Sequence, residues 1–211
     1  MLEFPYGIAD FHAIRRDGMV YVDRTSYLRD VERLGRILVF LRPRRFGKSL
    51  WLQTLATYYD LRYADAFEEI FGGLDIASGG QGPTPLRNRF FVLQWNFSRV
   101  SPRGDIEAIA ESLEDHVRTR ARVFVSEYRE HLDEAVDTDG RASTILDNLT
   151  SAVRRTPYKL YLLIDEYDNF VNEVMVRDVA TYKALFEADG PYKELMKAVK
   201  NAPPESGDRH H

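Results

Sequence analysis

Three adjacent residues, Gly47, Lys48 and Ser49, combine the groups that bind a nucleotide phosphate. A glycine lets the backbone approach a phosphate closely, a lysine offers positive charge to its oxygens, and a serine hydroxyl is a ligand for Mg²⁺. The triplet is common by chance, so its surroundings decide between a phosphate loop and a basic surface turn. It follows the apolar run ILVFL (37–41) and opens SLWLQTLATYY (49–59), as expected where a phosphate loop joins a buried strand to a helix.

The first residues of this loop depart from the usual pattern, which has a glycine five positions before Gly47. Arg42 stands there, and an arginine adopts positive φ at a higher cost, so we expect a loop of different shape. Pro43 stiffens the loop and removes one N–H donor. Each arginine either adds donors to a polyphosphate or points into solvent. The residues expected to contact a nucleotide are Arg42, Pro43, Arg44, Arg45, Phe46, Gly47, Lys48, Ser49 and Leu50.

A pair of acidic residues, Asp165 and Glu166, ends the second apolar run, KLYLLID (159–165). In open α/β sheets ligands bind at the C-terminal ends of strands. We therefore expect Asp165 to hold Mg²⁺ together with Ser49, and Glu166 to polarise an attacking water. The alternative is that both acids merely end a strand.

The elements that must position these groups alternate along the chain. Short, continuous apolar runs predict buried parallel strands over 36–41 and 159–165, and an aromatic and β-branched run predicts a third over 89–97. A shorter strand is expected around MVYVD (19–23), and the polar stretch 77–88 is expected to be a loop inside the domain.

Apolar residues at helical spacing predict the intervening helices. The predicted helices are 49–61, 105–135, 143–155 with Ser143 as its cap, one that begins at Pro191, one from about Thr25 and one from near Asn169. Asp168 either caps this last helix or contacts the acidic site. Alternating strands and helices predict an α/β layered fold.

The chain length of 211 residues fits one domain, or one domain plus an appendage, and the hydrophobic fraction of 44% is enough for a buried core. We expect an N-terminal adapter over 1–35, a core over 36–200 and a disordered tail over 201–211. The final pair, His210 and His211, is typical of an added tag rather than a metal site.

The net charge of −4 argues against a protein that coats nucleic acid by bulk positive charge, although it permits a local basic patch. With no cysteine, disulfides and thiolate metal sites are excluded. The first residues lack the pattern of a signal peptide, and the apolar runs are too short to span a bilayer. We expect a cytoplasmic protein without a membrane partner.

Three stretches together carry a family resemblance: YVDRTSYL (21–28), FLRPRRFGKSL (40–50) and LYLLIDEYDNF (160–170). In this order and at these separations they resemble the bacterial AAA-ATPase-like proteins, in which arginine replaces the first glycine of the loop. The resemblance covers nearly the whole chain. It implies a P-loop NTPase with three α/β/α layers and a mostly parallel sheet, which binds ATP and Mg²⁺ and often precedes a PD-(D/E)XK nuclease-like domain.

The same resemblance implies roles for individual residues. Lys48 and Ser49 correspond to the phosphate and metal contacts, Asp165 to a metal ligand and Glu166 to the catalytic carboxylate, with Lys48 also catalytic. The stretch Tyr21 to Thr25 either packs beside the nucleotide base or forms a structural turn in which Asp23 or Thr25 caps a helix.

The resemblance further implies that such proteins continue past the acidic strand into another strand, which lies at the centre of the sheet. We therefore expect this chain to be incomplete at its C-terminal end, with unpaired strand edges. Weak nucleotide binding and slow hydrolysis would follow.

The leading functional hypothesis is an Mg²⁺-dependent ATPase module that drives or licenses an attached nuclease-like domain. A nucleotide-binding switch with negligible turnover is the first alternative. A nucleic-acid-binding module using RPRR (42–45) and RTRAR (118–122) is the second, and the net negative charge speaks against it. A small-molecule kinase is a weaker option because no lid or acceptor pocket is recognisable. DNA is expected as a partner through the nuclease-like domain, and an oligomer is possible.

Overall fold

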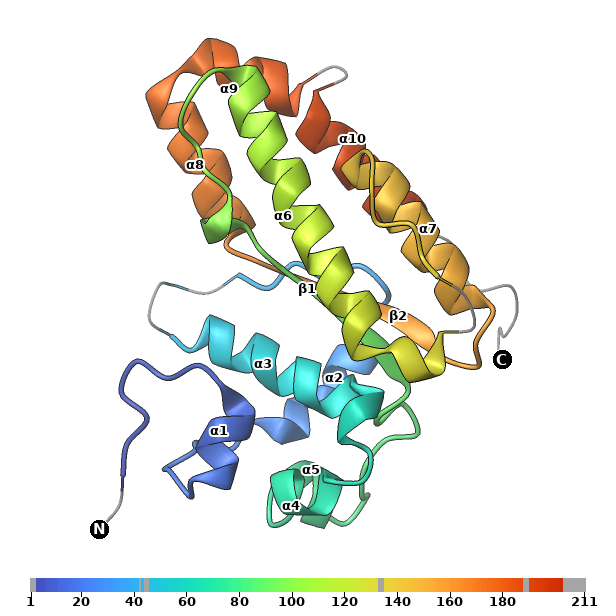
Figure 1. Cartoon of the computed structure of the whole chain (residues 1–211). Helices are drawn as coiled ribbons and strands as arrows, with labels where there is room; N and C mark the ends of the chain where they lie inside the picture. Colours follow the sequence, from blue (N-terminus) through green and yellow to red (C-terminus); the bar gives the residue numbers. More distant parts are fainter. Residues whose placement is uncertain (1–2, 42, 44–45, 133–134, 188–189, 203–211) are drawn as a thin grey trace. The chain divides into compact units, whose positions relative to one another are not determined.

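The computed structural model describes residues 3–41, 43, 46–132, 135–187 and 190–202. It divides into two compact units, residues 1–92 and 93–211 (Figure 1). Both units are mostly helical, and a small parallel sheet makes the fold a mixed α/β one.

The first unit is built around the helix that follows the phosphate loop. Its helices are α1 (Phe11–Arg16), α2 (Leu28–Arg33), α3 (Lys48–Tyr59), α4 (Phe67–Phe71) and α5 (Asp75–Ser78), with short 3-10 turns at Thr25–Tyr27 and Leu61–Tyr63. Helix α3 packs against α1, and α1 against α4. Phe11 and Phe71 are fully buried where these helices meet, with ring centroids 5.1 Å apart. Burial of large aromatic side chains of this kind is the main stabilising term of a small unit.

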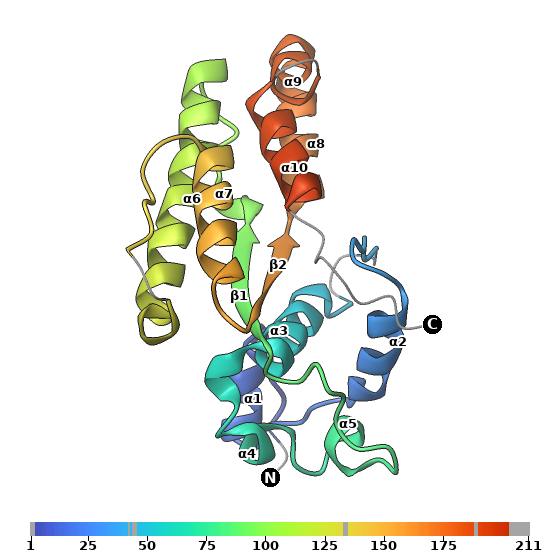
Figure 2. The ribbon, with the colours of Figure 1, turned by 90° about the vertical axis from the view of Figure 1, so that its right-hand side faces the viewer.

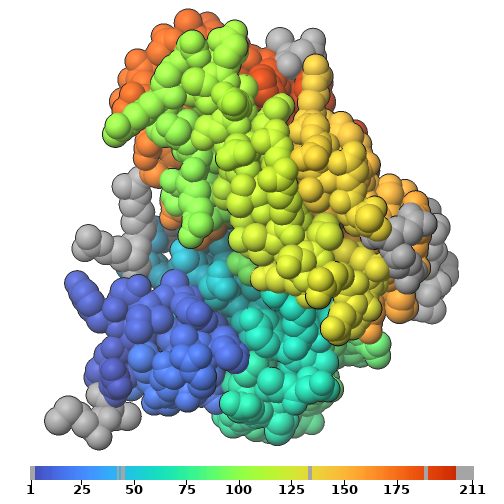
Figure 3. All heavy atoms as spheres, viewed as in Figure 1, coloured from blue at the N-terminus to red at the C-terminus, as the bar shows by residue number. Residues whose placement is uncertain are grey.

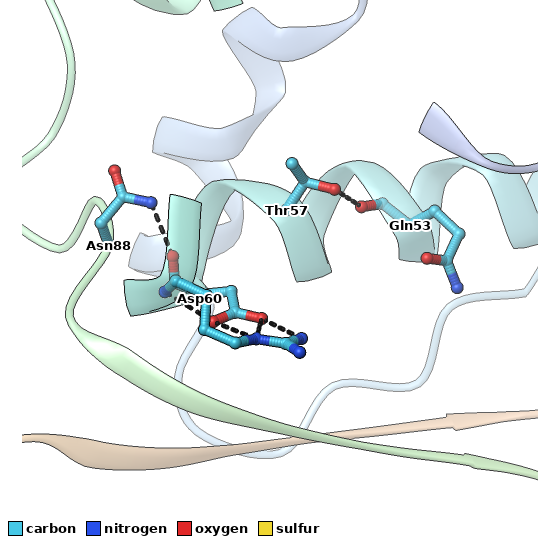
Figure 4. A network of polar contacts seen from close by, with 5 residues as sticks. Gln53, Thr57, Asp60 and Asn88 are labelled. Carbon is cyan, nitrogen blue, oxygen red and sulfur yellow. Dashed lines mark hydrogen bonds and ion pairs between the residues drawn. The ribbon is translucent and has the colours of Figure 1, made fainter. Parts of the chain in front are cut away.

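The C-terminal end of α3 is fixed by buried polar contacts (Figure 4). Asp60 is only 1% exposed, and its carboxylate accepts hydrogen bonds from the guanidinium of Arg62, the shortest at 2.6 Å. Asn88 donates through Nδ2 to the Asp60 carbonyl at 2.7 Å, and its backbone N–H donates to Tyr58. Orphan carbonyls at a helix end need such partners, so the register of α3 is set from this end.

The second unit contains most of the sheet. Strand β1 (Phe90–Asn96) passes from the first unit into the second and pairs with β2 (Lys159–Asp165); the two strands point the same way in Figure 2. The helices are α6 (Ile106–Glu127), α7 (Ala142–Arg154), α8 (Tyr167–Arg177), α9 (Val179–Phe186) and α10 (Pro191–Asn201). Helix α6 lies along α7, as the space-filling view also shows, and α7 packs against α10 (Figure 3).

Side chains of α6 bind one edge of β1. Arg120 donates through Nε to the Gln94 carbonyl at 2.9 Å, and the Asn96 N–H donates to Nε2 of His116 at 3.2 Å. Gln94 and Asn96 are two residues apart, so these backbone groups point to the same strand edge. An edge that would otherwise expose unpaired backbone groups is therefore covered by α6.

An aromatic cluster fills the space between α8, α9 and α10. Phe186 contacts Tyr192 with a centroid distance of 4.5 Å, Phe170 contacts Phe186 at 5.9 Å, and Phe97 contacts Tyr192 at 5.9 Å. Pro191 occupies the first turn of α10, as its fixed φ favours. The prediction of a helix opened by Pro191 is therefore confirmed.

Two strand predictions are wrong. Residues 36–41 and 19–23 are not strands, and neither belongs to the sheet that the described residues form. In the first segment Ile37, Val39 and Leu41 are exposed at 67%, 65% and 78%. A continuous apolar run predicts a buried strand only where neighbouring strands pair with it, and here the run has no place in the sheet.

The predicted cap at Ser143 is wrong, and one of the two alternatives for Asp168, that of a helix cap, is excluded. Helix α7 begins at Ala142 and its N-cap is Arg141, so Ser143 lies inside the first turn. Helix α8 begins at Tyr167, which places Asp168 in its first turn and not at its cap. Across the described part of the chain, no helix has the length and apolar character needed to cross a membrane.

Candidate functional site

The N-terminus of α3 carries the glycine, lysine and serine of the phosphate loop. Gly47 is the N-cap in a left-handed conformation with φ 74°, and its carbonyl accepts the Trp51 N–H at 2.9 Å to begin the helix. Lys48 and Ser49 form the first turn and are half-buried. A residue with a Cβ would be strained at this φ, so the sharp turn into α3 requires glycine.

This helix start suits an anion. A Cβ built on Gly47 would meet no atom within 4 Å, so space is open directly in front of the backbone. The N-terminus of a helix carries partial positive charge and backbone donors, and α3 has 12 residues to align its dipoles. The residues present therefore fit a bound phosphate group.

The beginning of the loop is described only in part. The Phe46 N–H donates to the Pro43 carbonyl at 3.4 Å, and the Phe46 side chain is 62% exposed. Arg42, Arg44 and Arg45, which were expected to contact phosphate, lie outside the described residues. Their contribution stays a prediction.

The acidic pair lies at the junction between β2 and α8. Glu166 is the N-cap of α8 and has φ 58°, a left-handed conformation that costs a non-glycine residue free energy. Asp165, the last residue of β2, accepts the Glu166 N–H through Oδ1 at 3.0 Å. Both side chains are half-buried. The turn presents two adjacent carboxylates at the C-terminal end of a strand, beside the positive end of a helix.

The two groups of predicted site residues belong to different units. Gly47, Lys48 and Ser49 are adjacent in the first unit, and Asp165 and Glu166 are adjacent in the second. The expected metal site needs Ser49 from one unit and Asp165 from the other. Within the residues that the structure describes, no group of three or more acidic, histidine or cysteine side chains is arranged to hold a metal ion.

The stretch Tyr21 to Thr25 forms a structural turn. Asp23 accepts the N–H and the hydroxyl of Thr25 through Oδ1, at 2.8 and 2.7 Å, and the Asp75 N–H through Oδ2 at 2.7 Å. Thr25 is fully buried, and its hydroxyl oxygen accepts the Ile76 N–H at 3.1 Å. Asp23 and Thr25 therefore join the 3-10 turn to the start of α5, so the stretch is a structural turn. Neither residue is the cap of the helix that follows, because Arg24 precedes the 3-10 turn and Tyr27 is the N-cap of α2.

Contacts on the buried face of α3 were not expected from the sequence. The Tyr21 hydroxyl lies 3.3 Å from Oγ1 of Thr54, which is fully buried. Thr54, a polar residue among the mostly apolar buried residues of α3, is a sequence feature that could have indicated a partner.

A separate surface cavity of about 340 Å³ lies before β1. Its lining is formed by Pro83, Thr84, Pro85, Arg87 and Arg89. None of these residues belongs to the phosphate loop or to the acidic pair, and both arginines are exposed. The cavity is therefore not the site predicted from the sequence.

Comparisons with known proteins identify the family of this chain. The family described as "Predicted AAA-ATPase", the AAA-ATPase-like family, matches residues 5–205. A protein of Azotobacter chroococcum mcd 1, described as an uncharacterized protein in the vnfD 5' region, is 39% identical over 75 residues. That match covers 35% of this chain and 14% of the other protein, so the chain spans only a small part of that relative. No solved structure matches. Since the family match covers nearly all of the chain, the protein belongs to the AAA-ATPase-like family.

Proposed function

We propose that this protein is a P-loop NTPase module that binds ATP with Mg²⁺ through residues 42–50 and hydrolyses it. The observation that carries the proposal is the left-handed conformation of Gly47, which is the N-cap of a 12-residue helix whose first two residues are Lys48 and Ser49. Backbone donors, a lysine charge and a hydroxyl thus stand together at one helix terminus.

The roles follow from the chemistry of each group. Lys48 would bind the β and γ phosphate oxygens, and Ser49 and Asp165 would hold Mg²⁺, which neutralises charge on the phosphates when bound. Glu166 would orient and polarise the attacking water, because it is a carboxylate placed next to the proposed metal ligand. A three-layer P-loop fold and an attached domain moved by the ATP cycle belong to the same proposal.

The first test is calorimetric titration of Mg²⁺–ATPγS into the protein and into its Lys48→Ala variant. We expect binding to weaken by roughly tenfold to a hundredfold in the variant, because a charge-assisted contact to phosphate is lost. Lys200→Ala, at an exposed position of α10, is the control and should bind like the unaltered protein. Equal binding by Lys48→Ala, or no binding by a folded unaltered protein, would contradict the proposal.

A nucleotide switch with negligible turnover is the alternative. Replacing Glu166 with Gln distinguishes the two. In an ATPase it should slow hydrolysis strongly and leave ATP trapped on the protein, whereas in a switch it should change little. The measurement is the ratio of ATP to ADP that stays bound after incubation with Mg²⁺.

A further inference from the structure

A chain of two hydrogen bonds connects the N-terminal segment to the helix of the phosphate loop. The Tyr21 hydroxyl lies 3.3 Å from Thr54 Oγ1, and Thr54 Oγ1 donates to the Leu50 carbonyl at 3.0 Å. Thr54 is fully buried and Tyr21 is half-buried. All three residues belong to the first unit.

The direction of these hydrogen bonds follows from counting protons. A threonine hydroxyl has one proton, and that of Thr54 points at Leu50. Tyr21 must therefore be the donor to Thr54. Burial raises the pKa of Tyr21 above its ordinary value, so the phenol keeps the proton that this arrangement requires.

The chain of bonds ends at the first turn of α3. Leu50 directly follows Ser49 in this turn, and in an α-helix its carbonyl faces Thr54, four residues later, and so links the first turn to the next. A threonine that bonds back to the carbonyl four residues earlier tends to bend a helix. A partner that holds this threonine in one rotamer therefore sets the local course of the helix.

Tyr21 is itself held firmly. Its ring packs edge-on against Phe11, with centroids 5.0 Å apart, and Phe11 is fully buried in the core of the unit. Two residues further along the chain, Asp23 accepts two hydrogen bonds from Thr25 and one from the Asp75 N–H, and the last of these joins the segment to α5. The phenol ring is thus anchored by packing on one side and lies next to a hydrogen-bonded turn.

We propose that Tyr21 is a positioning residue for the phosphate loop. Through Thr54 it holds the Leu50 carbonyl, and therefore the first turn of α3 that carries Lys48 and Ser49, in one orientation. This inference rests on the proposed nucleotide binding and gives the stretch Tyr21 to Thr25 a part in it. The hydroxyl acts at a distance and does not contact the nucleotide.

The test compares Mg²⁺–ATPγS affinity and thermal stability in matched tyrosine variants. Tyr21→Phe removes the hydroxyl and keeps the ring against Phe11; we expect Kd to rise about twofold to tenfold, the value of one hydrogen bond. Tyr58→Phe is the control. Tyr58 lies on α3, as Thr54 does, but its hydroxyl bonds to Thr84, away from the loop. We expect it to lower stability at least as much while leaving Kd unchanged.

A double-mutant cycle tests the route through Thr54. Thr54→Val should weaken binding like Tyr21→Phe, and the two changes together should weaken it no further than Thr54→Val alone. Thr54→Ser, which keeps the hydroxyl, should bind like the unaltered protein.

The outcomes separate this inference from the proposed function. If the unaltered protein binds, Lys48→Ala does not and Tyr21→Phe binds normally, then only the positioning role is overturned. The positioning role is likewise overturned if Tyr58→Phe weakens binding as much as Tyr21→Phe does. If the unaltered protein does not bind, or Lys48→Ala binds equally well, both proposals fall.

Discussion

Glu166 and Asn88 are the non-glycine residues with positive φ among those described, at 58° and 53°, but they have different surroundings. The Asn88 side chain donates to the Asp60 carbonyl, so its conformation is stabilised by a buried bond. Glu166 is half-buried at the end of β2, where its carboxylate is proposed to act on water. Strain of this kind is often retained where it orients a functional group.

Glycine at position 166 should relieve this strain. We expect Glu166→Gly to be about 0.5–1 kcal/mol more stable than Glu166→Ala, because a left-handed conformation costs alanine more than the extra chain entropy costs glycine. Both variants lack the carboxylate, so the difference between their unfolding free energies reflects the backbone conformation of residue 166. Urea unfolding of the two proteins measures it.

Asn88 provides the contrasting control for this experiment. Asn88→Gly also relieves a left-handed conformation, but it removes a buried hydrogen bond at the C-terminal end of α3. It should therefore destabilise the protein. If Glu166→Gly were less stable than Glu166→Ala, the conformation of residue 166 would not be left-handed.

At the scale of elements, we expect the contact between α6 and β1 to depend on pH. Burial, together with the charges of Arg120 and Arg99, lowers the pKa of His116 to about 4, against a smaller opposite effect of Asp115. The neutral ring is needed because Nε2 accepts the Asn96 N–H. Protonation would replace this acceptor with a donor.

The sign of the resulting pH dependence follows from the two states. The unfolded chain takes up a proton at His116 near the ordinary value of 6.5, whereas the folded protein does so only near 4. The contribution of the neutral His116 ring to the free energy of unfolding is therefore fully present above pH 6.5 and is lost as pH decreases from 6.5 towards 4. Gln at position 116 keeps an acceptor but does not titrate, so His116→Gln should show a smaller loss of unfolding free energy between about pH 7 and pH 5. Equal losses in both proteins would show that His116 is not the group responsible.

The elements differ in how far the sequence predicts them. Strands over 89–97 and 159–165 are predicted, and β1 and β2 are found over 90–96 and 159–165, because their apolar side chains meet other elements. The run 36–41 has the same local character, but pairing partners are not encoded in the run itself. Sequence periodicity indicates the local preference of a segment for a strand, but a strand forms only where another strand pairs with that segment.

The candidate site shows the same division between local and non-local information. Gly47 at the start of a helix is predictable, since glycine, lysine and serine between an apolar run and a helical pattern are all local signals. The left-handed Glu166 is not, because the junction of β2 with α8 imposes it. The link from Tyr21 to Thr54 spans 33 residues, and no spacing rule covers it.

At the scale of the whole molecule, the exposure of residues 37–41 allows a direct test of whether the strand predicted over 36–41 is absent. Val39 is 65% exposed, so Val39→Lys should change the unfolding free energy by less than about 0.5 kcal/mol. Leu163 in β2 is 7% exposed, and Leu163→Lys should cost more than about 3 kcal/mol because a charge would be buried without a partner. Denaturant titration of both variants is the measurement. A similar large loss in Val39→Lys would mean that the run is buried as a strand after all.

The chain contains two tryptophans, and each compact unit holds one of them. Trp51 lies in α3 of the first unit and Trp95 in the part of β1 that belongs to the second; they are 8% and 1% exposed. Each unit thus has its own intrinsic fluorophore, and both fluorophores are buried. Emission from a Trp51→Phe protein reports the second unit alone, and emission from Trp95→Phe reports the first, so one optical titration of each tells whether the two units lose their structure together. Because Trp51 is two residues after Ser49, its emission is also the natural signal for a ligand arriving at the phosphate loop.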